Sequence, residues 1–160
     1  MNGGILPILL ICATLGLALS LVARRDAWLG VTAIVLSSLV VSTLKIAPDA
    51  SNILFAGLFL STIFTALLVY LPRVWPRRWA IPVAVNAGGW AGALASLSGM
   101  HTALWLALPL CLICLPGRWI EQRGLGIAVM VAASWMIAIA SLALFVSMMP
   151  HPGYVPDHME

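Results

Sequence analysis

The sequence consists of long apolar runs separated by short polar stretches. A helix needs about 20 apolar residues to cross a bilayer, and most of the runs come close to that length. We therefore predict an all-α integral membrane protein. One polytopic transmembrane domain should cover residues 1–149, and residues 150–160 should form an extracytoplasmic tail. The predicted membrane segments are 4–22, 27–46, 53–71, 80–99, 102–115 and 125–149.

The segment 102–115 differs from the others because it is short for a full span and carries Pro109. Two arrangements fit it. It could cross where the bilayer is thinned or a neighbour is tilted, or it could be the second arm of a re-entrant hairpin that begins at Ala80. The pattern thus predicts a bundle of six transmembrane helices, or of five plus a re-entrant arm. We interpret residues 116–124 as a loop.

Positive charge predicts how the chain is oriented. Alternate loops hold all the arginines, and Lys45 alone among the basic residues falls on the other side, at the far end of the segment 27–46. Loops rich in arginine stay in the cytoplasm, so we expect an inner (plasma) membrane protein with both termini outside. Tryptophan and tyrosine favour the membrane interface, and several fall on the arginine side: Trp28, Tyr70, Trp75, Trp79 and Trp119.

Composition limits the environment and the partners. Hydrophobic residues make up 62% of the chain and charged residues only 8%, whereas soluble domains have about 25% charged residues. The main solvent should therefore be lipid. A net charge of +3 that lies in loops does not suggest nucleic acid. The expected partners are the bilayer and either other membrane subunits or further copies of the chain.

Small residues recur every four positions along the fourth segment. One stripe holds Ala84, Gly88, Gly92 and Ser96, and a second stripe of alanines lies beside it. Such faces let two helix backbones approach closely, which favours association in lipid. We predict that this helix is the packing centre of the bundle and that Gly88 and Gly92 face another helix.

Cysteines form the first candidate site. The spacing Cys111-x-x-Cys114 is compatible with a redox pair or a metal. The pair is expected near the cytoplasmic end of a segment among leucines, where thiols stay reduced. We therefore favour ordinary apolar packing for both, and for Cys12 as well.

Methionines and histidines of the outer surface form the second candidate site. Thioether and imidazole groups together suit a soft ion such as copper. These side chains have no regular ligand spacing, so the alternative is that methionines end the spans and the tail is merely polar. The candidate metal ligands are His101, Met148, Met149, His151 and His158.

A polar stripe forms the third candidate site. Ser38, Ser42 and Lys45 follow one another at helical spacing and, with Asn86 and Trp90, could line a cavity for a solute. Hydroxyls in membrane helices more often bond their own backbone or a neighbouring helix. We favour that second interpretation.

These observations point to a role without catalysis. The predicted segments contain no Asp, Glu, His or Arg, and no catalytic grouping or phosphate-binding loop is present. We expect no enzyme and no cofactor, and predict a non-catalytic subunit or accessory protein of a larger inner-membrane complex. The alternative is a small solute or metal-ion permease, acting alone or as an oligomer. An intramembrane redox enzyme using Cys111 and Cys114 is a third possibility.

Overall fold

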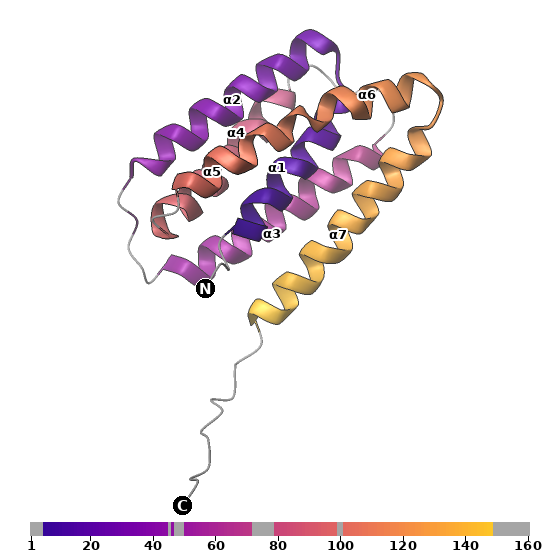
Figure 1. The fold of residues 1–160 in the computed structure, drawn as a ribbon. Helices are drawn as coiled ribbons and strands as arrows, with labels where there is room; N and C mark the ends of the chain where they lie inside the picture. Colours follow the sequence, from indigo (N-terminus) through magenta and orange to yellow (C-terminus); the bar gives the residue numbers. More distant parts are fainter. Residues whose placement is uncertain (1–4, 45, 47–49, 72–78, 99–100, 149–160) are drawn as a thin grey trace, which may run out of the picture.

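The computed structural model describes residues 5–44, 46, 50–71, 79–98 and 101–148 (Figure 1). Most of the described residues are helical, and none of them lies in a strand. The elements in chain order are α1 (Ile5–Ser20), α2 (Arg24–Ser42), α3 (Ser51–Leu67), the 3₁₀ turn η2 (Leu68–Tyr70), α4 (Ala80–Ser98), α5 (His101–Ala107), the 3₁₀ segment η4 (Leu108–Ile113), α6 (Cys114–Gln122) and α7 (Gly126–Met148).

Five helical stretches of the described chain are long and apolar enough to cross a membrane, judged by length and composition. The helix α1 is apolar but shorter, with 16 residues. Large apolar side chains point outward over much of the bundle, with Ile127 75% and Trp135 67% exposed. Soluble monomers rarely expose contiguous apolar surface on this scale. The five long stretches are Arg24–Ser42, Ser51–Tyr70, Ala80–Leu97, Leu104–Gln122 and Gly126–Met148.

The helices run alternately up and down the bundle. The last residues of α1, η2 and α6 and the first residues of α2, α4 and α7 gather at one end (Figure 1). We call this the arginine end, because Arg24, Arg25, Arg118 and Arg123 lie there. Three tryptophans near the same helix ends are exposed, namely Trp28, Trp79 and Trp119.

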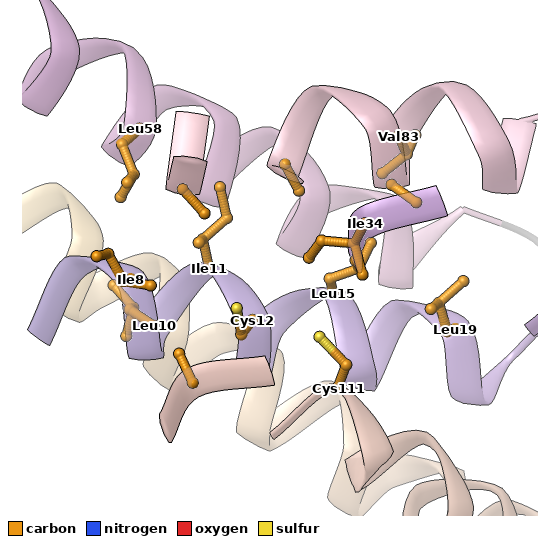
Figure 2. Packing of buried hydrophobic residues seen from close by; sticks show 14 of the residues in the cluster. Ile8, Leu10, Ile11, Cys12, Leu15, Leu19, Ile34, Leu58, Val83 and Cys111 are labelled. Atoms are coloured by element: carbon orange, nitrogen blue, oxygen red, sulfur yellow. The ribbon is translucent and has the colours of Figure 1, made fainter. Parts of the chain in front are cut away.

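The centre of the bundle is α1. The small-residue spacing had predicted α4 in this position. Ile8, Ile11 and Leu15 have no exposed surface, and α1 contacts α3, α4, α5, η4 and α6. Figure 2 shows side chains from α2, α3, α4 and η4 arranged around it. A helix that is apolar all round can be buried on every side. The small-residue spacing of α4 specifies close approach to one neighbouring helix, and this differs from a central position in the bundle.

The close approach is between α4 and α2. A Cβ atom added at Gly88 would lie 2.7 Å from the carbonyl oxygen of Ile34, and one added at Gly92 would lie 3.0 Å from the Cα of Ser38. Both glycines therefore face the backbone of α2, as the spacing predicts. Ala84 is buried on the same stripe, and the Ser96 hydroxyl bonds the Leu44 carbonyl just beyond the end of α2. The second stripe, with Ala87, Ala91 and Ala95, is buried in the main apolar core.

The prediction of a loop over 116–124 is wrong, because α6 continues to Gln122. Pro116 is the third residue of α6, and the first turn of a helix tolerates proline since its N–H has no helical partner there. Gly117 packs against α1, where a Cβ would lie 2.9 Å from the Cβ of Ser20. Its small size therefore serves helix packing. The real turn comes at Gly124, whose φ of 78° ends α6.

The stretch α5–η4–α6 consequently forms one rod along the bundle (Figure 1). It is longer than the segment 102–115, and Leu104–Gln122 meets the length for a span. The 3₁₀ segment η4 contains Pro109 near its start and ends at Ile113, three residues before Pro116. The rod's backbone passes close to α1, because a Cβ at Gly16 would lie 2.9 Å from the carbonyl oxygen of Leu110.

Replacing Gly92 tests the contact between α2 and α4. We expect Gly92→Ala to lower the free energy of unfolding by about 1–3 kcal/mol, because the added methyl group meets backbone that cannot move alone. Gly92→Leu and Gly88→Leu should disrupt the bundle. Reversible unfolding in mixed micelles measures the change. Gly126→Ala is the matched control, since no atom lies within 4 Å of that Cβ position. Equal stability of the two alanine variants would contradict the packing argument.

Candidate functional site

The most prominent polar contact between helices joins α3 and α4. The Asn86 amide of α4 donates a hydrogen bond of 2.5 Å to the Ser61 hydroxyl of α3. The Asn86 carbonyl oxygen accepts a bond of 3.2 Å from the indole N–H of Trp90, one turn further along α4. Ser61 is buried, whereas Asn86 is exposed on the outside of the bundle. We call these three residues the Asn86 cluster.

A glycine on α3 positions the tryptophan of this cluster. A Cβ at Gly57 would lie 2.7 Å from the Cζ2 atom of Trp90, so the indole ring lies directly against the backbone of α3. This contact holds the ring where its N–H can reach Asn86. In hydrocarbon, bonds of this kind join helices that have no hydrophobic drive to associate. The cluster therefore fixes α3 against α4.

The other predicted cavity residues do not join this cluster. The Ser38 hydroxyl bonds the Val35 carbonyl at 3.0 Å and the Ser42 hydroxyl bonds the Leu39 carbonyl at 2.8 Å, both within α2. Ser38 is buried where α2 meets Gly92. Lys45 lies outside the described residues. The described part of the polar stripe is thus divided between two helix contacts, which agrees with the second interpretation given for it.

Most of the predicted metal ligands lie beyond the described chain. Met149, His151 and His158 are outside the described residues, and for His101 the structure describes only the backbone, at the start of α5. Met148 ends α7 and is 66% exposed. Over the described residues no group of three or more His, Cys, Asp or Glu side chains could hold a metal ion. Copper binding by the outer methionines and histidines stays a prediction.

The structure brings together a different pair of cysteines from the one that the sequence spacing suggested. The thiols of Cys12 in α1 and Cys111 in η4 face each other within hydrogen-bonding reach (Figure 2). Cys114 is one turn further along the rod. All three are buried and carry free thiols, as expected for apolar packing. The pair formed by Cys12 and Cys111 could not be found from the sequence, because 98 residues of chain separate its members.

The arginine end holds a further polar site that the sequence did not reveal. Arg118 of α6 donates a bond of 2.7 Å to the Val22 carbonyl, just beyond the end of α1. A cation there complements the negative end of the α1 dipole. Beside it lies a pocket of about 290 Å³ between residues 20–23 and Arg118, Glu121 and Gln122. The Arg123 guanidinium lies 3.8 Å from the Trp119 ring centroid. Because 116–124 was predicted as a loop, these contacts were not anticipated.

The fold and these contacts define an all-helical bundle that carries several membrane-compatible helices. Comparison with known protein families, with curated proteins and with solved structures finds no match. The geometry of the described residues is therefore the basis for any functional proposal.

A double-mutant cycle tests the Asn86 cluster. We expect Asn86→Ala and Ser61→Ala to be coupled by about 0.6–2 kcal/mol in unfolding free energy, because either change alone removes the same bond. Asn86→Ala with Thr62→Val is the control cycle. The Thr62 hydroxyl bonds Leu58 of its own helix, so its coupling to Asn86 should be close to zero. Similar coupling in both cycles would contradict a specific bond between α3 and α4.

Proposed function

We propose that this chain is a non-catalytic, multi-pass subunit or accessory protein of a larger inner-membrane complex. The arginine end faces the cytoplasm, and both termini lie outside. Cytoplasmic arginines stay in water or at anionic headgroups. The protein contributes a packed helical unit with large outward apolar faces, on which lipid and other membrane subunits can lie.

One observation carries this proposal: the buried hydroxyl groups of the described helices already have hydrogen-bond partners within the bundle. Thr14, Thr62 and Thr65 bond the backbone of their own helices, as do Ser20 and Ser38, and Ser61 accepts from Asn86. A path for a solute needs polar groups that are free to contact it. Because these hydroxyls already have partners, they favour a structural role over a permease.

The glycines of α4 support the same conclusion. Gly88 and Gly92 lie directly against the backbone of α2. In a permease, such residues would be expected along an open cavity. The outer helix α7 adds a second argument. Only 17% of its membrane-compatible stretch is buried within the chain, so most of its surface is left for lipid or for other subunits.

Cysteine labelling tests the orientation. Asn52 at the start of α3 and Gln122 at the end of α6 are exposed at opposite ends of the bundle. We expect an impermeant maleimide to modify Gln122→Cys only from the cytoplasmic side and Asn52→Cys only from outside. The unsubstituted chain is the control, because its cysteines are buried. Labelling of Asn52→Cys from the cytoplasm would reverse the proposed orientation.

Native purification tests the role. The tagged chain, solubilised from its own membrane in two mild detergents, should migrate with the same additional polypeptides in a fixed ratio through two successive purification steps. A Gly92→Leu variant, whose bundle should be disrupted, is the control and should lose them. A chain that purifies without other polypeptides and moves a solute across liposomes would contradict the subunit proposal.

A further inference from the structure

We propose that α4 also carries a self-association surface, where the outward face around Asn86 and Gly89 meets the same face of a second copy of this chain. The proposal requires that the protein inserts in the membrane in a single orientation, which the labelling experiment tests separately. It does not require the other subunits of the proposed complex, so the two ideas can fail independently.

The first observation is a polar group left partly unused at membrane depth. Asn86 lies within α4 and is exposed. Its amide has two N–H donors and its oxygen has two lone pairs, of which Ser61 takes one donor and Trp90 takes one acceptor site. Among the described residues the second N–H and the second lone pair have no partner. Hydrocarbon offers none either, so both groups favour a neighbouring helix that supplies them.

The second observation is an open position on the same face. Gly89 follows Asn86 by three residues, a spacing that places both on one side of a helix. Apart from its chain neighbours and the nearby backbone of α4, no atom of the described residues lies within 4 Å of the point where a Gly89 Cβ would be. At Gly88 and Gly92, in contrast, atoms of α2 lie where a Cβ would be. An outward glycine beside a partly unused amide lets another backbone come close enough for the amide to bond it.

Symmetry favours a second copy as the occupant. Copies of one protein that insert in the same orientation are related by an axis along the membrane normal, so Asn86 of one copy lies at the same depth as Asn86 of the other. In a two-fold contact each amide can donate to the other and accept from it, so the free donor and acceptor of both copies are used. A different partner would need a donor and an acceptor at this same depth.

Energy transfer in vesicles tests the proposal. The full chain, labelled at Gln122→Cys with donor or acceptor dyes, is reconstituted in phosphatidylcholine and phosphatidylglycerol vesicles. We expect Gly89→Leu to lower the association constant at least about tenfold, because the new side chain separates the amides. The bundle should stay intact, since no other element of the described chain comes within 4 Å of that Cβ position. Gly126→Leu, at another open glycine on α7, should associate like the parent chain.

Two further substitutions separate self-association from folding. Asn86→Leu removes both the internal and the outward bonds, and should abolish association. Ser61→Ala removes only the internal partner and leaves the amide in place, so it should retain association. Unchanged association in Asn86→Leu would overturn the proposal.

Cross-linking locates the contact. Gly89→Cys, oxidised by copper phenanthroline in the same vesicles, should form a disulfide-linked dimer, and Gly126→Cys should not. The proposal is overturned if the chain is monomeric at every protein-to-lipid ratio, or if Gly89→Leu associates like the parent. It is also overturned if Gly89→Cys in the native membrane links to a different polypeptide. Absence of co-purifying subunits would contradict the proposed complex and leave the dimer result unaffected.

Discussion

Close backbone contact at small residues is the interaction on which this bundle depends. In lipid, apolar side chains gain little by leaving the solvent for a neighbouring helix, so association requires backbones that approach closely. Gly88 and Gly92 provide this between α4 and α2, and Gly16 and Gly117 provide it between α1 and the rod α5–η4–α6. Every one of these glycines lies where a Cβ would meet another helix within 3.1 Å. The helices could not adopt this arrangement with larger residues there.

Polar groups complete the packing. Most hydroxyls of the described helices bond a carbonyl three or four residues earlier, which satisfies them without a neighbour. A few bonds reach another element: Asn86 to Ser61, Tyr70 to the Met130 carbonyl, and Arg118 to the Val22 carbonyl. These tie α4 to α3, η2 to α7 and α6 to α1. Asn86 and Tyr70 are both exposed and lie in membrane-compatible stretches, but Tyr70 ends its stretch at the arginine end, whereas Asn86 lies within α4. This position is the basis of the proposed association surface on α4.

The way these groups are used supports the proposed structural role. The side chains that could have lined a solute path are divided between two helix contacts, and the thiols that could have formed a redox pair are buried among apolar side chains. Groups that could bind a partner lie on the outside of the bundle. Most of α7 is not covered by the described chain, and α4 presents Asn86 beside the open position at Gly89. These exposed faces support the proposal that the protein acts through lateral contacts in the membrane.

The sequence by itself determined most of the helices, their alternation and the packing face of α4. Apolar run length decides whether a segment can cross a bilayer, arginine position marks one end, and a four-residue spacing of small side chains is a property of one helix alone. The tertiary structure decided the rest. It placed α1 at the centre, kept α6 helical through Pro116 and Gly117, and paired Cys111 with Cys12 and Asn86 with Ser61. These features depend on which helices become neighbours, and local periodicity contains no information about that choice.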